Sequence, residues 1–275
     1  MDLSGVKLIC LDMDGTLFDR SGHIPDVNIA ALQKCIARGI RVALVSGRNY
    51  RFLGQFAAQI DRSVLIVSSN GARIDSSAGG TCLYEGKFSD SAASYALSAF
   101  YGLGIYFEVY TENVNYIFRQ ELIPEEHRRS LDMYLLNGHV LEAHVMDALP
   151  GKPIQGIYKL VAFSNNESEI ACARQKLDLL KIKHCSSGSH NIESMAPGVG
   201  KGSAVEKLAE LLKIDVKDTL AFGDYTNDLD MILTAGHGIA MGNGVDVLKQ
   251  AAEYVAPPNT LGGVAYVLNK FVLGE

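Results

Sequence analysis

Two acidic residues, two positions apart, follow directly on an apolar run near the start of the chain. The run covers residues 6–11, and Asp12-Met13-Asp14-Gly15-Thr16 comes next. Side chains alternate along an extended backbone, so Asp12 and Asp14 would project the same way beyond a strand's carboxyl end, where open α/β sheets bind ligands. Two such carboxylates cost free energy unless a cation or a proton compensates them. A plain Asp-Gly turn after a strand is the structural alternative.

A second acidic pair follows another apolar run near the other end of the chain. The segment Phe222-Gly223-Asp224-Tyr225-Thr226-Asn227-Asp228 places Asp224 and Asp228 there. Mg²⁺ takes hard oxygen ligands from one or two carboxylates and keeps room for water and phosphate. Four acids at two strand ends therefore predict a magnesium site in outline.

Three further segments carry groups suited to a phosphate. Ser46-Gly47-Arg48 offers a hydroxyl, a flexible backbone and a helix start, whose N–H groups and dipole can hold a phosphate oxygen. Ser69-Asn70-Gly71 has similar polar, turn-forming chemistry, and Lys201 lies between two glycines where it could neutralise phosphate or carboxylates. Each segment is weak by itself, because Asn-Gly is an ordinary turn and most lysines are solvated.

Short apolar runs alternate with amphipathic ones at both ends of the chain, which is typical of parallel strands joined by helices. We expect strands at 6–11, 42–45, 64–68, 219–222 and 237–241, and helices at 27–38, 49–60, 203–212, 229–234 and 261–271. Together these predict one α/β unit with a doubly wound, mostly parallel sheet, and they bring the polar segments to its edge.

The middle of the chain has a different texture. Aromatic, alternating strands at 105–110 and 116–119 and helices at 89–100 and 168–180 predict an α+β unit with an antiparallel sheet. Gly79-Gly80 and Pro197-Gly198 are boundary signals, because linkers need a permissive backbone. The expected organisation is a core made of residues 1–80 and 191–275, with residues 81–190 inserted as a second domain.

Composition excludes several classes of partner. The 275 residues include 31 acidic and 25 basic side chains, a formal charge of −6, which argues against nucleic acid because phosphate backbones are bound by excess Lys and Arg. No apolar run approaches the ~20 residues of a membrane span. The five cysteines form no CxxC pair, which favours free thiols in a reducing cytoplasm. We expect a cytoplasmic protein that is a monomer or a weak homo-oligomer.

In combination, the motifs resemble those of the haloacid dehalogenase superfamily of phosphatases, and within it the Cof-type branch with a large α/β cap between the second and third motifs. The matches in family order are DMDGT at 12–16, SGR at 46–48, SNG at 69–71, GVGKGSA at 198–204, GDYTND at 223–228 and IAMGNG at 239–244. The resemblance implies a Rossmann-like core with an inserted cap, a Mg²⁺ cofactor and a small phosphorylated metabolite as substrate.

The resemblance also implies roles for single residues. Asp12 would attack phosphorus to give an aspartyl-phosphate, and Asp14 would protonate the leaving alcohol and then deprotonate water. Asp12, Asp224 and the backbone carbonyl of Asp14 would bind Mg²⁺, while Asp228 would orient metal-bound water. Lys201 would hold the transferring group. The phosphate-binding residues implied by the motifs are Ser46, Gly47, Arg48, Asn70, Gly71 and Asn227.

Several positions depart from the branch's usual pattern. Tyr225 and Thr226 stand where small or acidic residues are usual, and Gly244 stands where alanine is usual. Tyr225 could narrow substrate access, whereas the sequence assigns no effect to the departure in the loop at Pro257-Pro258. Specificity is expected from the cap. Its candidate contact residues are Arg119, Lys159, His184, Ser187, His190 and Glu193.

Two other functions fit parts of the same pattern. A phosphotransferase or mutase of the superfamily would pass the phosphoryl group to a second sugar hydroxyl instead of water. A non-enzymatic switch that accepts phosphate on an aspartate would need a long-lived acyl phosphate, and Asp14 argues against it because a base two residues away shortens that lifetime.

Overall fold

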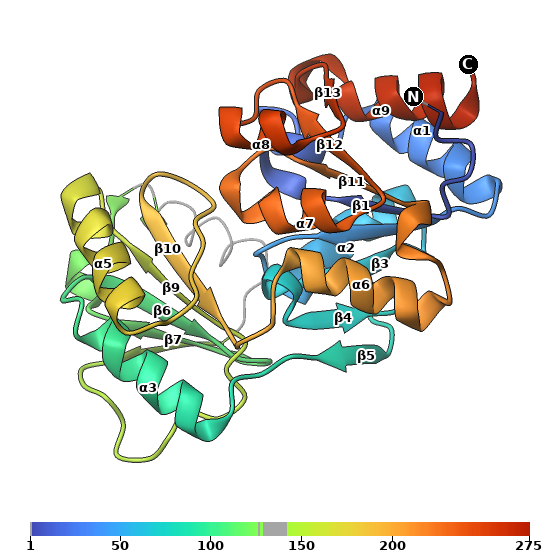
Figure 1. The fold of residues 1–275 in the computed structure, drawn as a ribbon. Helices are drawn as coiled ribbons and strands as arrows, with labels where there is room; N and C mark the ends of the chain where they lie inside the picture. The colour runs from blue at the N-terminus through green and yellow to red at the C-terminus, as the bar shows by residue number, and fades with distance from the viewer. Residues whose placement is uncertain (1, 126, 129–141) are drawn as a thin grey trace. The chain divides into compact units, whose positions relative to one another are not determined.

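The computed structural model describes residues 2–125, 127, 128 and 142–275. Within these, the chain divides into two compact units, one made of residues 2–85 with 199–275 and the other of residues 86–198. Each has its own sheet (Figure 1). None of the described helices is long and apolar enough to span a membrane.

Strand β1 (Leu8–Leu11) occupies the middle of the first sheet, and all four of its residues are buried. It pairs in parallel with β2 (Arg41–Val45) on one side and with β11 (Thr219–Gly223) on the other. Burial on both faces explains why these strands are continuous apolar runs without alternation. The parallel arrangement of β1, β2 and β11 is thus as the sequence predicted.

The full order of this sheet is β13-β12-β11-β1-β2-β3-β4-β5. The outer strands are β3 (Leu65–Ser68), β4 (Arg73–Asp75), β5 (Cys82–Glu85), β12 (His237–Met241) and β13 (Tyr254–Ala256). Only β4 and β5 run antiparallel to their neighbours. The sheet is therefore mostly parallel, and an antiparallel pair closes one of its edges.

Helices cover both faces of this sheet (Figure 1). On one face α1 (Asp26–Ala37), α2 (Tyr50–Ile60), and α9 (Gly263–Val267) with its continuation over Leu268–Leu273 pack on Ile9 and Leu11. On the other, α6 (Lys201–Leu212) and α7 (Leu229–Thr234) pack on Leu8 and Cys10. Helix α8 (Asp246–Ala251) contacts α7 and β12. The predicted doubly wound α/β fold is confirmed.

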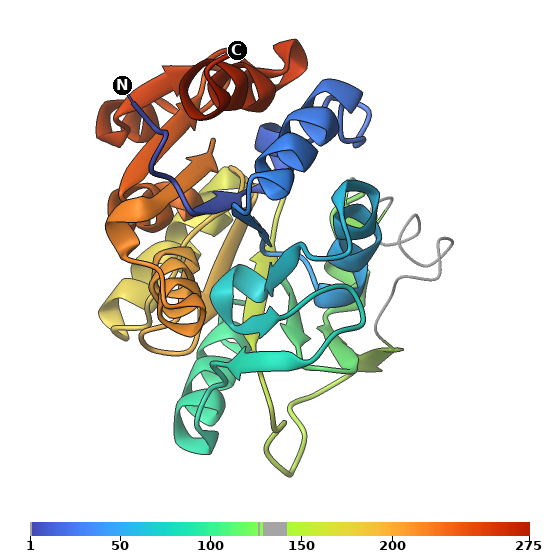
Figure 2. The same cartoon turned by 90° about the vertical axis from the view of Figure 1, so that its right-hand side faces the viewer.

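The first and last segments of the described chain lie side by side (Figure 2). Leu3 donates its backbone N–H to the carbonyl of Phe271 at 3.1 Å.

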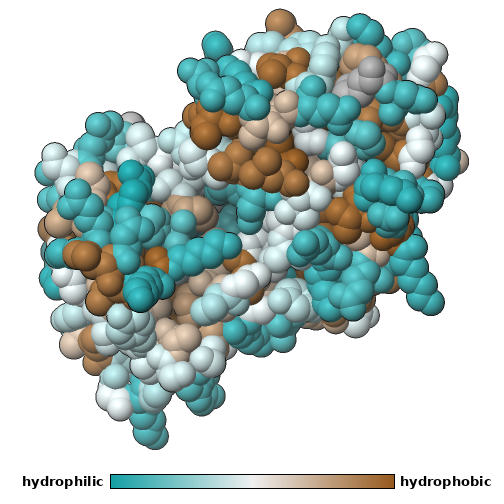
Figure 3. Space-filling view, viewed as in Figure 1, coloured by the Kyte–Doolittle hydropathy of each residue, from teal (hydrophilic) through white to brown (hydrophobic). Residues whose placement is uncertain are grey.

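Most of the surface in one view is hydrophilic, but apolar side chains gather over α7 and α8 (Figure 3), where Leu233 and Val247 are exposed. All five cysteines are free, as the sequence predicted, and two of them, Cys10 and Cys35, are buried.

The second unit contains a five-stranded sheet in the order β10-β9-β6-β7-β8. Its strands are β6 (Tyr106–Tyr110), β7 (Val114–Phe118), β8 (Glu142–Met146), β9 (Lys159–Phe163) and β10 (Asn191–Met195). The expectation of an antiparallel sheet is wrong at one pair, because β7 and β8 are parallel. Residues 119–141 separate these two strands, and a connection of that length allows a parallel crossover.

The two faces of this second sheet differ in chemistry. Helices α3 (Asp90–Tyr101) and α5 (Glu167–Leu179) contact β9 and β10, and Phe107 of β6 lies 6.1 Å from Phe100 of α3 between ring centroids. Glu108, the next residue along β6, must point to the opposite face and is fully buried. Buried acidic and basic side chains thus belong to the face that does not carry the Phe100–Phe107 contact.

Strand pairing sets the limits of both units a few residues away from the expected ones. Residues 82–85, expected in the inserted region, form β5 of the first sheet, and residues 191–195, expected in the core, form β10 of the second. Neither strand carries a strong apolar signal, since each mixes polar and apolar residues, so the sequence did not assign these two strands to their sheets.

Glu108 provides a test of the second unit's stability. Burial would raise the pKa of Glu108, but His127 at 2.5 Å, together with bonds donated by Tyr106 and Asn115, lowers it from 4.5 to about 2. A lowered pKa stabilises the folded state above pH 4.5, and we expect this contribution, about 3 kcal/mol, to vanish as the pH falls toward 2. The measurement is the thermal midpoint against pH for the unmodified chain and Glu108→Gln.

The variant Glu108→Gln should be less stable near neutral pH and should lose less stability in acid. Glu142→Gln is the matched control, because Glu142 is exposed and its carboxylate contacts His144 at the surface. Equal acid sensitivity of Glu108→Gln and the unmodified chain would contradict the assignment.

Candidate active site

The two acidic strand ends lie next to each other because β1 and β11 are neighbours. Leu11 is paired with Phe222, so Asp12 and Asp224 leave the same edge of the sheet one and two residues later. The hydroxyl of Thr16 donates to Asp224 at 3.1 Å. Gly15 has φ +81°, and a Cβ added there would lie 2.2 Å from an Asp224 carboxylate oxygen. The first acidic loop therefore approaches Asp224 more closely than any side chain would allow.

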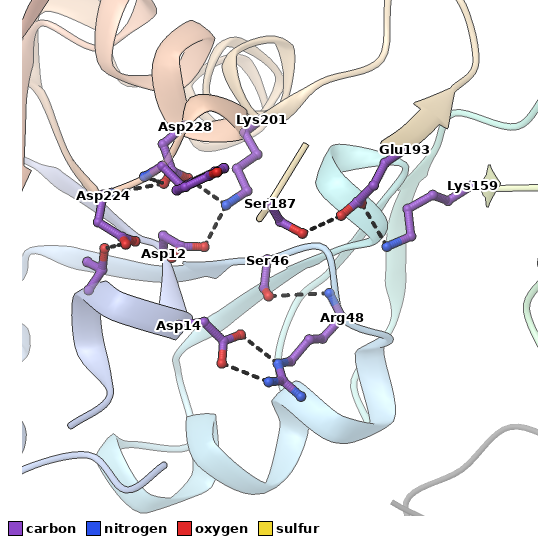
Figure 4. A network of polar contacts seen from close by, with 12 residues as sticks. Asp12, Asp14, Ser46, Arg48, Lys159, Ser187, Glu193, Lys201, Asp224 and Asp228 are labelled. Carbon is purple, nitrogen blue, oxygen red and sulfur yellow. Dashed lines mark hydrogen bonds and ion pairs between the residues drawn. The ribbon is translucent and has the colours of Figure 1, made fainter. Parts of the chain in front are cut away.

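Three of the four predicted acids form a cluster (Figure 4). One carboxylate oxygen from each of Asp12, Asp224 and Asp228 lies within 4.8 Å of the others. The Asp228 side chain is held by the backbone, since the N–H groups of Asp224 and Tyr225 both donate to its Oδ2 at 3.0 Å. The cluster is held by the turn after β11 as well as by the sheet.

Lys201 is buried between two of these acids. Its Nζ donates to Asp12 Oδ1 at 2.5 Å and to Asp228 Oδ1 at 2.6 Å, and its side chain has no exposed area. Lys201 is the first residue of α6, which places the ammonium group at this edge of the sheet. The sequence predicted that Lys201 could neutralise both phosphate and carboxylates. In the structure it bridges two carboxylates, and its role toward phosphate stays a prediction.

Burial and mutual repulsion act on the carboxyl groups. Burial, reinforced by the charge of Asp228, raises the pKa of Asp12 well above its ordinary value and raises that of Asp224 to about 7. Burial would lower the pKa of Lys201, but the charges of Asp12 and Asp228 outweigh it and raise the pKa. Three acids and one base leave a negative excess at one point, which is the condition that favours a bound cation or proton.

The set of donors fits Mg²⁺. Carboxylate oxygens are hard ligands of the kind this ion prefers, and no histidine or cysteine stands among the three. The residues that would hold it are Asp12, Asp224 and Asp228.

The polar ends of β2 and β3 are joined to each other through the backbone. Asn70 donates its N–H to the carbonyl of Ser46, and Ser69 donates to the carbonyl of Arg48, both at 2.9 Å. The hydroxyl of Ser46 accepts from the N–H of Arg48 at 3.3 Å. The segments Ser46-Gly47-Arg48 and Ser69-Asn70-Gly71 are therefore hydrogen-bonded to each other at the same edge of the sheet.

Comparison with known proteins places this site in a family. Residues 9–268 match the family model for haloacid dehalogenase-like hydrolases. The chain belongs to the haloacid dehalogenase-like hydrolases. Among curated proteins it is 30% identical to the Bacillus subtilis 5-amino-6-(5-phospho-D-ribitylamino)uracil phosphatase YwtE, over 98% of this chain and 99% of that one. It is 26% identical to the HMP-PP phosphatase of Serratia proteamaculans, over 88% of this chain and 86% of that one.

A solved structure agrees with the match. A haloacid dehalogenase-like hydrolase from Bacillus subtilis superposes with a TM-score of 0.83 at 25% identity, covering 97% of this chain and 100% of that one. The resemblance to the Cof-type branch and the enzyme class, a phosphatase, are confirmed by these matches.

In this hydrolase, the side chain of Asp14 stands apart from the three-aspartate cluster. Its two oxygens accept from Nε and Nη2 of Arg48, both at 2.7 Å (Figure 4). The sequence assigned Arg48 to phosphate and Asp14 to the metal through its backbone carbonyl, and these roles stay predictions. The structure adds a bidentate ion pair between Asp14 and Arg48, which the two motifs did not predict.

Gly71 and Gly47 have a packing reason in the hydrolase. Gly71 has φ +98°, and a Cβ there would lie 2.3 Å from the carbonyl oxygen of Gly200, the residue before α6. Gly71 thus lets the turn after β3 approach the helix start that carries Lys201. A Cβ at Gly47 would meet Asn70 Oδ1 at 3.0 Å. Asn227 lies in the short turn over Thr226–Asp228, beside the cluster.

Sequence reasoning missed two asparagines that brace the first acidic loop. Asn243 donates to the carbonyl of Gly15 at 2.7 Å, and its own Oδ1 accepts from the N–H of Asn259. Asn259 in turn donates to the carbonyl of Phe18 at 2.7 Å. Both residues stood in motifs or loops already noted, but a bond to a distant backbone carbonyl leaves no sequence signal.

Several predicted specificity residues of the second unit bond to one another. Lys159 donates to Glu193 at 2.9 Å, with both side chains buried, and Ser187 donates to Glu193 at 2.5 Å. His184 pairs with Asp178 at 3.0 Å. Arg119 has φ +54° and stacks over the ring of Tyr101 at 5.0 Å. A substrate-contacting role stays a prediction for all of them, including His190.

Lys201 provides the test of the charge cluster. Removing one partner of a buried ion pair leaves uncompensated charge, so we expect Lys201→Met to lower the free energy of unfolding by about 3–5 kcal/mol, measured by urea denaturation. Lys207→Met is the control in the same helix, because Lys207 is partly exposed and pairs with Glu210 at the surface, and we expect a change within about 0.5 kcal/mol. Equal stability of the two variants would refute a bridging role for Lys201.

Proposed function

We propose that this hydrolase is a Mg²⁺-dependent phosphatase that cleaves small phosphomonoesters through an aspartyl-phosphate on Asp12. The observation that carries the proposal is the arrangement of Asp12, which is buried, bonded to Lys201 and clustered with Asp224 and Asp228. Bound there, Mg²⁺ would supply charge cancellation between an anionic nucleophile and a phosphate dianion.

The protein's own residues would act in two steps. In the first, a carboxylate oxygen of Asp12 bonds to phosphorus, the bond from phosphorus to the ester oxygen breaks, and that oxygen takes the proton of Asp14. In the second, the Asp14 carboxylate takes a proton from water, the water oxygen bonds to phosphorus, and the bond to Asp12 breaks. Asp14 ends protonated, as it began, and the products are an alcohol and phosphate.

The remaining residues would bind and orient. Lys201 donates to one oxygen of Asp12, so the other oxygen is available for attack. The positive charge of Lys201 would attract the negatively charged phosphoryl group that is transferred. The hydroxyl of Ser46, at the end of β2, would bind a phosphate oxygen, since the neighbouring backbone N–H groups of Arg48, Ser69 and Asn70 already have acceptors in the protein. Asn227 supports the same end of the site.

The substrate class is proposed from the relatives. One relative's name describes a phosphorylated sugar alcohol joined to a uracil ring, and the other is named an HMP-PP phosphatase. We therefore propose sugar phosphates or phosphorylated cofactors as substrates. A cytoplasmic location follows only from cysteine usage and stays a prediction.

The nucleophile is tested with a generic aryl phosphate. With Mg²⁺, the purified protein should release inorganic phosphate in stoichiometric yield, and Asp12→Asn should abolish the release because an amide is a poor nucleophile. EDTA should stop the unmodified enzyme, and added Mg²⁺ should restore it. Asp246→Asn is the control, because it makes the same chemical change at the exposed start of α8.

Substantial turnover by Asp12→Asn would refute the covalent route. Phosphate yield well below the alcohol yield, with a second phosphorylated product, would favour the phosphotransferase alternative.

The acid–base role is tested at Asp14. We expect Asp14→Asn to fold normally and to lose about 10² to 10⁴ in kcat, the usual contribution of a positioned acid or base. Circular dichroism and steady-state kinetics measure the two. Activity equal to that of the unmodified enzyme would mean that another acid serves.

A further inference from the structure

Arg48 and Asp14 form a two-pronged ion pair within the first unit. Nε and Nη2 of the guanidinium each donate to a different carboxylate oxygen at 2.7 Å. The side chains remain 29% and 55% exposed, so the pair is reachable from solvent and is not part of the packed core. Such a fork fixes the plane of the carboxylate as well as its position.

The guanidinium is itself held from the other side by Phe52. The Cζ atom of Arg48 lies 4.4 Å from the centre of that ring. Phe52 belongs to the first turn of α2, and its backbone N–H is accepted by the side chain of Asn49 at 2.9 Å, which caps the helix. A cation over an aromatic face is attracted to it, so the helix start determines where the fork points.

The contacts continue and close on the loop that carries Asp14. Phe52 meets Phe56 at 5.0 Å between ring centroids, and Phe56 meets Phe18 edge-on at 4.6 Å. The N–H of Phe18 is bonded to the carbonyl of Met13 at 2.9 Å, one residue before Asp14. Helix α2 therefore contacts this loop at Phe18, through Phe56, and also supports the Arg48 side chain that holds Asp14, through Phe52.

This closed set of contacts has a consequence for the acidic cluster. A carboxylate only two residues from Asp12 is a natural competitor for any cation bound by Asp12, Asp224 and Asp228, and it would add to their repulsion. Its pairing with Arg48 compensates the charge and turns both oxygens away from the cluster (Figure 4).

We propose that Arg48, which lies over the ring of Phe52, is a positioning residue: it keeps the Asp14 side chain out of the three-aspartate cluster and oriented so that its protonated form can give a proton to the leaving group. The inference rests on the proposed function. It assigns Arg48 a different task from the phosphate contact implied by the motif, because two of its donors are already engaged by Asp14.

The test uses two nearly isosteric esters, phenyl phosphate and 4-nitrophenyl phosphate. Phenolate is a poor leaving group that needs a proton, whereas nitrophenolate leaves readily without one. The value of kcat/KM reports the steps up to release of the phenol, so it isolates the acid step from the later attack by water. We expect Arg48→Met to lose at least about tenfold more kcat/KM on phenyl phosphate than on 4-nitrophenyl phosphate.

Three further variants sharpen the result. Arg48→Lys keeps the charge but lacks the fork, and Phe52→Leu removes the platform, so both should change the ratio in the same direction by less. Arg51→Met is the matched control, because Arg51 lies in the same turn, is exposed and stacks on Tyr50 instead, and its ratio should be unchanged. In a double-mutant cycle, Arg48→Met should cost little once Asp14→Asn is present, because Arg48 acts through Asp14.

Each other outcome overturns the inference. An equal loss on both esters, with a raised KM that persists in the Asp14→Asn background, would mean that Arg48 binds the phosphoryl group directly. If Arg48→Met fails to fold by circular dichroism, an unchanged ratio in Arg48→Lys and Phe52→Leu decides against positioning. If the unmodified enzyme cleaves neither ester, the proposed function itself fails and the inference falls with it, whereas normal cleavage with an unchanged ratio in all variants removes the inference alone.

Discussion

The rest of the site depends on the interaction of the buried Lys201 ammonium group with two carboxylates. Two carboxylates, Asp12 and Asp228, meet at one point with almost no access to water, and only a positive charge between them makes that arrangement stable. The site still holds more negative than positive charge, because among the described residues no ion pair joins Asp224 to a basic side chain. The buried Asp12 and Asp228 are thus stabilised by Lys201, while the remaining negative charge still favours binding of a cation.

The sheet converts this local chemistry into a requirement on the whole first unit. Asp12 and Asp224 come together only because β1 and β11 are hydrogen-bonded neighbours, although more than two hundred residues of chain separate them. Lys201 arrives from α6, whose start must lie against the turn after β3, and Gly71 makes that approach possible. The core therefore positions the charges through contacts that no single motif contains.

Most of this could be predicted from the sequence, and for a physical reason. Strands buried on both faces are apolar runs, their parallel ends share one edge, and acids at such ends have few structural explanations, so Asp12, Asp224 and Asp228 were identifiable. The fork between Arg48 and Asp14 was not, since it depends on the directions of two side chains that lie 34 residues apart in the sequence. The parallel β7–β8 pair and the placement of β5 and β10 were also missed, because polar edge strands have no distinctive pattern.

The amide of Asn243 has a further consequence, which concerns how exacting this position is. Its nitrogen donates to the carbonyl of Gly15, and its Oδ1 accepts from the N–H of Asn259. An aspartate of nearly the same size would replace the donor by an acceptor and set two oxygens against each other. The loop that carries Asp12 therefore depends on an amide that lies far along the chain and that its isosteric acid cannot replace.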